Sequence, residues 1–141
     1  MDQYNRERRT YNVPSISKSP YIRTLLDDIG PNIDGKIVEA DGREDNSPVV
    51  SGEQLQCMVF EWMDTDLWQL PSKPFRSGSV MPHIVARSVL EALVVLASED
   101  GVHADVNPNN IFVSNAESNT PIVKLGDLGV GKFDPRSFGV C

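Results

Sequence analysis

The chain has few of the features that mark secreted or membrane-embedded proteins. Its 141 residues include only two cysteines, too few for a disulfide framework, and Cys57 lies in an apolar segment where a reduced thiol is expected in the core. No apolar run approaches the roughly twenty residues that a bilayer requires. Residues 1–10 are strongly polar, unlike a signal sequence. We therefore expect a cytoplasmic or nuclear protein without internal repeats.

Positive charge is also in short supply. Thirteen Lys and Arg residues stand against twenty Asp and Glu, which gives a net charge of -7. Such a balance argues against nonspecific binding to nucleic acid or to an anionic membrane, so neither is expected as a partner. The apolar content of 40% is enough for a core, and one domain is the default at this length.

One long helix is predicted to begin at Met81. Pro82 suits a first helical turn and Ser79 lies just before it as a cap. Arg87 and Glu91 are four residues apart and form a weak surface pair at most. Gly101 is expected to end the helix. Apolar residues at helical spacing predict that the helix is buried: Ile84, Val85, Leu90, Leu93, Val94 and Ala97.

Short strands are predicted on both sides of a polar turn. Residues 111–113 and 122–125 are rich in β-branched side chains, and the polar turn 114–121 separates them. Segment 30–53, by contrast, is rich in Gly, Pro and acidic residues and favours turns in solvent.

Two polar segments carry the groups that phosphoryl transfer needs. His-Ala-Asp-Val-Asn-Pro-Asn-Asn at 103–110 is followed by Gly-Asp-Leu-Gly at 126–129. In that reaction the protein mainly positions the substrates, while Mg²⁺ screens charge. Asp105 would accept the proton of a hydroxyl substrate, and Asn110 and Asp127 offer the oxygen ligands that Mg²⁺ prefers. Alone, an HxD tripeptide is more often a solvated turn, so the context decides.

These segments resemble the catalytic loop and the metal-binding loop of protein kinases. Residues 57–67, Cys-Met-Val-Phe-Glu-Trp-Met-Asp-Thr-Asp-Leu, resemble the fifth strand and hinge of the cyclin-dependent-kinase-like group. Residues 19–29, beginning Ser-Pro-Tyr-Ile-Arg, resemble the turn into the fourth strand. Four blocks in this order resemble a divergent Ser/Thr kinase domain over about 4–129. The resemblance implies an α+β fold, ATP and Mg²⁺ as cofactors, and a protein substrate that receives the γ-phosphoryl group.

By this resemblance the whole chain, 1–141, is a partial kinase domain truncated at both ends. The expected parts are a small-lobe remnant at 4–60 with an insertion at 30–53, a hinge at 61–66, the start of the large lobe at 67–129 and a truncated activation segment at 130–141.

The resemblance also implies a nucleotide site. Asp66 would accept hydrogen bonds from the ribose, with a capping role for a short helix 67–70 as the alternative. Taken alone, Phe60, Trp62 and Trp68 are more often packing residues than ligand contacts, since large aromatics mostly bury area. For Phe112 the alternative is an ordinary core residue, and His103 is expected to be structural. The adenine contacts implied are the backbone of Glu61, Trp62 and Met63, the gatekeeper Phe60 and the floor residue Phe112.

Several departures from the family pattern bear on activity. Ala104 stands at the usual Arg, which removes pairing with a phosphorylated activation loop. Asn107 stands at the usual Lys, so positive charge beside the phosphoryl group is lost. Leu128 replaces the usual Phe with another apolar side chain.

Other family elements are missing from the sequence. It has no glycine-rich loop before the hinge, no Val-Ala-x-Lys and no Ala-Pro-Glu. Glu7, in the helix expected at 4–12, is the candidate for the family's helix glutamate. Helix 81–97 would lack its usual cover, so a protein partner is expected there. The alternative to a kinase is a pseudokinase-like or truncated binding module without turnover.

Overall fold

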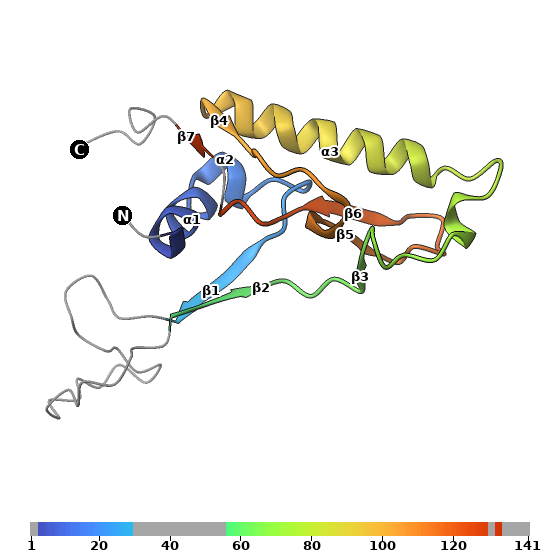
Figure 1. Ribbon diagram of the computed structural model, residues 1–141, viewed down its shortest axis with the longest axis horizontal. Helices are drawn as coiled ribbons and strands as arrows, with labels where there is room; N and C mark the ends of the chain where they lie inside the picture. The colour runs from blue at the N-terminus through green and yellow to red at the C-terminus, as the bar shows by residue number, and fades with distance from the viewer. Residues whose placement is uncertain (1–2, 30–55, 130–131, 134–141) are drawn as a thin grey trace, which may run out of the picture.

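The computed structural model describes residues 3–29, 56–129 and 132–133. This part of the chain mixes helices and short antiparallel strands, which confirms the predicted α+β class (Figure 1). The predicted insertion at 30–53 lies outside the described residues, as does the predicted activation segment at 130–141 except for 132–133. The helices are α1 (Gln3–Tyr11), α2 (Pro14–Ser17) and α3 (Met81–Ser98), with 3-10 turns η1 (Lys73–Phe75) and η2 (Pro108–Asn110).

A three-stranded antiparallel sheet lies at the centre, in the order β3 (Thr65–Asp66), β5 (Ile111–Ser114) and β6 (Ile122–Leu125). The β5–β6 hairpin is the one predicted from its β-branched residues. Val113 pairs with Val123, and both side chains are buried because they share the covered face of the sheet. Leu125 is fully buried and also bridges Ile22 in parallel, which brings the segment before β1 (Leu25–Ile29) to the sheet edge.

A separate two-stranded ribbon joins β1 to β2 (Cys57–Phe60) in antiparallel register, with Leu25 opposite Phe60. The ribbon extends away from α3 (Figure 1). The residues of β2 alternate between exposed and half-buried, since only one face of the ribbon is covered, whereas the register of β1 shifts between Leu25 and Asp27. Cys57 falls on the uncovered face, so the prediction that it packs in the core is wrong.

Helix α3 begins at Met81 as predicted, with Pro82 in its first turn and the Ser79 hydroxyl accepting the Met81 N–H at 3.1 Å. It runs along the sheet (Figure 1), and its buried residues Met81, Ser88, Ala92 and Leu96 form one stripe.

The other face of α3 is not covered by the described residues. Leu90 and Val94 are 62% and 63% exposed, so the prediction of a buried helix holds for one stripe only. The helix ends at Ser98, and Asp100 rather than Gly101 takes the left-handed conformation, at φ 53°. By its 18 residues and mean hydropathy (1.4) α3 could cross a bilayer, so the expectation that no apolar run approaches that length is wrong. Core helices of water-soluble proteins share this property.

The two N-terminal helices complete the core. Tyr11 of α1 and Ile16 of α2 are buried and pack with the apolar side chains of α3 and β6. Pro14 occupies the first position of α2, where its missing N–H costs no hydrogen bond. Helix α1 is thereby held beside residues 127–129, which brings the N-terminal segment to the predicted site.

Candidate functional site

His103 connects the two polar segments that the sequence singled out. Its side chain is 1% exposed. Nε2 lies 2.9 Å from the Gly126 carbonyl oxygen, and Nδ1 accepts the Asp105 N–H at 3.3 Å. With Nδ1 as acceptor, the ring proton is on Nε2 and is donated to Gly126. The imidazole lies beneath the loop and fixes Asp105 relative to the residue that precedes Asp127.

Asn110 holds the same two segments from the other side. Its side-chain Nδ2 donates to the Asp105 backbone carbonyl at 3.0 Å and to Asp105 Oδ2 at 3.1 Å. The backbone carbonyl of Asn110 accepts the Gly126 N–H at 2.9 Å. The side chain is 8% exposed. These bonds turn the amide nitrogen toward the loop, so Oδ1 is the atom left to act as a ligand.

The structure therefore brings Asp105 and Asn110 into direct contact and ties Asp127 to them through Gly126. We call residues 103–110 with 126–129 the loop unit. Both aspartates are exposed, as groups that meet a substrate must be.

Asp105 follows a residue with a left-handed backbone conformation, and Asp127 has that conformation itself. Ala104 has φ 64° and Asp127 has φ 56°, in the left-handed region that non-glycine residues avoid at a cost of about 1–2 kcal/mol. Strain of this kind collects at binding and catalytic sites, where surrounding contacts maintain it. The hydrogen bonds of His103 and Asn110 supply such contacts here.

Asn107, at the position of the usual lysine, is used within the loop. Its Oδ1 accepts the Asn109 N–H at 2.9 Å and caps η2, while Nδ2 donates to the Asp105 carbonyl at 3.2 Å. The side chain thus shapes the loop around Asp105.

Glu7 on α1 lies beside Asp127 and Gly129. A Cβ atom on Gly129 would lie only 2.8 Å from Glu7 Oε2, so the glycine permits this close approach. Burial raises the pKa of the Glu7 carboxyl, and the nearby Asp127 charge raises the pKa further. The helix glutamate proposed from the sequence is thus next to the predicted metal ligand.

The donor set fits Mg²⁺ chemically. Asp127 and Asn110 offer a carboxylate and an amide oxygen, the hard ligands this ion takes. Among the described residues, no three His, Cys, Asp or Glu side chains are grouped to bind one metal ion. In phosphoryl-transfer sites Mg²⁺ is bound by one or two carboxylates together with substrate phosphates.

The residues predicted to meet adenine lie in different environments. Phe112 on β5 lies so close to Gly126 that a Cβ there would be 2.7 Å from the Phe112 ring, which explains the glycine. Phe60 packs edge-to-face on Tyr11 with ring centroids 4.9 Å apart. Met63 is buried against Ser114, whereas Trp62 is 84% and Trp68 72% exposed. The packing interpretation is therefore wrong for both tryptophans.

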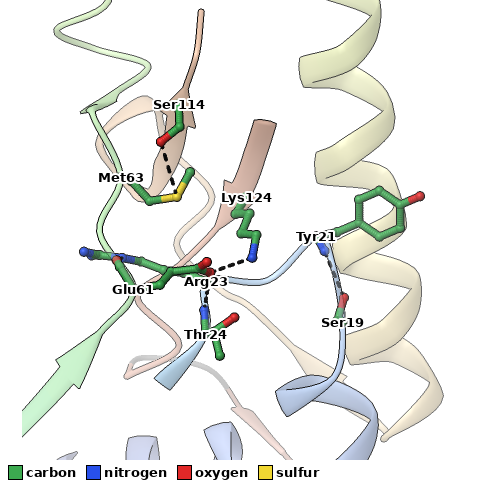
Figure 2. Close-up of polar contacts among 8 residues, drawn as sticks. All are labelled: Ser19, Tyr21, Arg23, Thr24, Glu61, Met63, Ser114 and Lys124. Atoms are coloured by element: carbon green, nitrogen blue, oxygen red, sulfur yellow. Dashed lines mark hydrogen bonds and ion pairs between the residues drawn. The ribbon is translucent and has the colours of Figure 1, made fainter. Parts of the chain in front are cut away.

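Glu61, the first residue of the predicted hinge, has a carboxylate that is fixed by two groups (Figure 2). Its carboxylate pairs with Lys124 Nζ at 2.6 Å and accepts the Thr24 N–H at 2.6 Å. Burial alone would raise the pKa of Glu61, but the lysine and the amide outweigh it and the pKa is lowered.

Asp66 takes the alternative role that the sequence left open. Its two carboxylate oxygens accept hydrogen bonds from the N–H and the side-chain amide of Gln69, at 2.8 and 2.7 Å. The segment it caps, 67–70, is a turn and not the predicted helix. A ribose would have to share these oxygens.

Arg23 is the site residue that sequence reasoning missed. Its Cζ lies 4.3 Å from the Phe112 ring centroid and 5.4 Å from that of Phe60, and Nε donates to the Glu61 carbonyl at 3.2 Å. Figure 2 shows the side chain reaching from the segment before β1 to the hinge. A lone arginine in the stretch Tyr-Ile-Arg-Thr-Leu-Leu at 21–26 was the available signal.

Three known proteins that are similar to part of the chain are named as kinases. No protein-family model matches the chain. It is 35% identical over 80 residues to the probable serine/threonine-protein kinase yakA of Dictyostelium discoideum and 32% identical over 85 residues to a probable myosin light chain kinase of that organism. It is 31% identical over 77 residues to a serine/threonine-protein kinase of Myxococcus xanthus.

The matched segments cover 55%, 60% and 54% of this chain but only 5%, 17% and 11% of those relatives. The chain therefore contains a protein-kinase-like region that corresponds to a small part of each relative.

Proposed function

We propose that this chain carries the catalytic-loop part of a protein kinase, which transfers the γ-phosphoryl group of ATP to Ser or Thr hydroxyls of a protein. The observation that carries the proposal is the loop unit, in which His103 and Asn110 bond to both segments and present Asp105 and Asp127 from one frame. The kinase relatives support the same reading.

In this proposal Asp105 is the catalytic carboxylate. Asn110 Nδ2 holds its Oδ2 and the His103 ring holds its backbone N–H, so the carboxylate is oriented before a substrate arrives. It accepts the proton of the attacking hydroxyl, and positioning of this kind makes up most of the catalysis in phosphoryl transfer.

Asn110 Oδ1 and the Asp127 carboxylate would hold Mg²⁺, which screens phosphate charge when bound. The adenine edge would meet the backbone of residues 61–63 with Phe112 beneath the ring. Residues 4–60, 61–66 and 67–129 then correspond to the small-lobe remnant, the hinge and the start of the large lobe.

A second function, a pseudokinase-like or truncated binding module without turnover, has one observation in its support. Asn107 is committed to capping η2 and puts no cation beside the phosphates. A chain of this kind would act by binding a protein, and the exposed Leu90 and Val94 on α3 offer apolar surface for it.

Two measurements on the same protein test the proposal. Mg-ATP at a hundred times its dissociation constant should raise the free energy of unfolding by about 2.7 kcal/mol, seen as a higher melting temperature. Radiolabelled phosphate transfer to a generic protein substrate should fall at least a hundredfold in Asp105→Asn. The matched control is Asp27→Asn, on the exposed ribbon strand β1.

The outcomes separate the two functions. A thermal shift with transfer that Asp105→Asn abolishes supports the kinase. A shift with equal background transfer in both proteins leaves a nucleotide-binding module. With millimolar Mg-ATP, an unchanged melting temperature would remove both the kinase and its nucleotide-binding variant.

A further inference from the structure

The base side of the proposed nucleotide site already contains a planar, hydrogen-bonding group of this chain. The Arg23 guanidinium lies 4.3 Å from the centroid of Phe112, a stacking distance. Its Nε–H donates to the Glu61 carbonyl at 3.2 Å. A flat group stacked on Phe112 and donating to the Glu61 carbonyl is what an adenine ring would be in the proposed function.

The surroundings hold Arg23 in this place. Its backbone N–H donates to the Leu125 carbonyl at 2.8 Å, which fixes the residue at the edge of β6. The centroid of the Phe60 ring lies 5.4 Å from Arg23 Cζ. The Cβ atom of Arg23 would lie 3.4 Å from a Cβ atom added to Gly126. The side chain is half-buried and contacts both the Glu61 carbonyl and the Phe112 ring of β5.

The Glu61 carboxylate is not free to draw Arg23 elsewhere. Its Oε1 is bonded to Lys124 and to the Thr24 N–H, so it is already neutralised (Figure 2). The guanidinium is left with the ring faces and the Glu61 carbonyl. Arginine keeps its charge at all physiological pH values, so this contact does not depend on proton binding.

We propose that Arg23 is an autoinhibitory group that occupies the adenine position and must swing out before a nucleotide binds. This inference rests on the proposed nucleotide site and adds its regulation. The affinity for a nucleotide is then reduced by the fraction of molecules in which Arg23 has left. If the arginine is in place nine times out of ten, its removal strengthens binding about tenfold.

In this proposal Arg23 competes with the adenine base and not with the phosphates. Ligands that contain the base can therefore be compared with a ligand that contains phosphates alone. Adenosine, Mg-ATP and magnesium tripolyphosphate are titrated by calorimetry into wild-type protein, Arg23→Val, Arg23→Lys and Arg76→Val. Arg23→Val removes the guanidinium, and Arg23→Lys keeps the charge without the planar fork. Arg76→Val is the matched control, because Arg76 is an exposed arginine just after η1.

We expect Arg23→Val to bind adenosine and Mg-ATP at least tenfold more tightly than wild type, with Arg23→Lys in between. Tripolyphosphate affinity should change less than twofold, and Arg76→Val should match wild type throughout. Equal nucleotide affinity in wild type and Arg23→Val overturns the autoinhibitory role but leaves the proposed function standing. Weaker binding in Arg23→Val makes the arginine a ligand contact, which also overturns it. If neither protein binds adenosine or Mg-ATP, both proposals fail.

A measurement on wild type alone guards against variants that fail to fold. In ¹⁵N-labelled protein the Arg23 Nε–H resonance should be shifted by the Phe112 ring current. Saturating adenosine should return it to the position of an exposed arginine. A resonance that stays in place with adenosine bound would show that base and guanidinium do not compete.

Discussion

The loop unit and the predicted hinge, residues 61–66, differ in how their polar groups are used. In the loop unit, backbone groups and the side chains of His103 and Asn110 bond to one another, while the Asp105 and Asp127 carboxylates face solvent. At the hinge, the Glu61 carbonyl is already bonded to Arg23 and the Glu61 carboxylate to Lys124 and Thr24.

The difference is that the loop unit is prepared for a ligand, whereas the predicted hinge is already occupied by groups of the chain itself. The loop unit holds its chemical groups ready because the buried His103 and the Nδ2 of the buried Asn110 supply the supporting bonds, while Asn110 Oδ1 is left to act as a ligand. The hinge satisfies its own polar atoms internally, so a ligand there must replace bonds and not simply add them. Breaking one region should therefore leave the other largely intact.

The largest loss is expected from His103→Ala. Removing a 1% exposed ring that bonds to Gly126 and Asp105 leaves a cavity and two unpaired backbone groups, for a cost of about 3 kcal/mol in the free energy of unfolding. His83, the other histidine, is exposed on α3, and His83→Ala should change stability by less than about 0.5 kcal/mol. Urea denaturation of both variants measures this. Equal midpoints would contradict the frame we assign to His103.

Gly126→Ala should have the next largest effect, because Gly126 is where the two regions touch. Its new Cβ would lie 2.7 Å from the Phe112 ring, which Arg23 covers, so overpacking should cost about 2 kcal/mol. Gly129→Ala meets only the flexible ends of Glu7 and Gln3 and should cost less. The double variant Gly126→Ala with Phe112→Leu should recover part of the loss. If the two alanines are equally harmful in thermal denaturation, the crowding argument fails.

A smaller, pH-dependent effect is expected at the hinge from Lys124→Met. Because the pKa of Glu61 is lowered in the folded state, its stabilisation is complete above the ordinary value near 4.5 and is lost as the pH falls through the lower folded-state pKa. The substitution should cost about 1 kcal/mol at pH 7 and progressively less below pH 4.

The pair Lys73–Glu117 is the control for that prediction, since both side chains are more than half exposed. Lys73→Met should change the free energy of unfolding by less than about 0.5 kcal/mol at any pH. A Lys124→Met cost that stays constant down to pH 3 would mean that the ion pair is not its source.

Local sequence patterns predicted much of the fold. The start of α3 at Met81 followed from Pro82, and the β5–β6 hairpin followed from β-branched runs around a polar turn. The burial of α3 was overestimated, because helical spacing of apolar residues does not say how many faces find a neighbour. Cys57 was misplaced for the same reason, since a two-stranded ribbon covers one face only.

The candidate site was predictable in part. Asp105, Asn110 and Asp127 were chosen from motif spacing, and the structure joins them through bonds to Gly126 that no spacing could reveal. Arg23 was missed because its partners Glu61 and Phe112 lie 38 and 89 positions away in the sequence. Asp66 shows the converse, since its local capping role was correctly left open beside the ribose role.

The central claim is that Asn110 and Asp127 bind the metal of a bound nucleotide. The most direct test adds ATP and substoichiometric Mn²⁺, a paramagnetic substitute for Mg²⁺, to ¹⁵N-labelled protein. We predict that the amide resonances of Asn110, Asp127 and Asp105 broaden beyond detection, while those of Asp27 and Asp28 on β1 stay sharp. Broadening centred on other carboxylates, with Asn110 and Asp127 unaffected, would contradict the account.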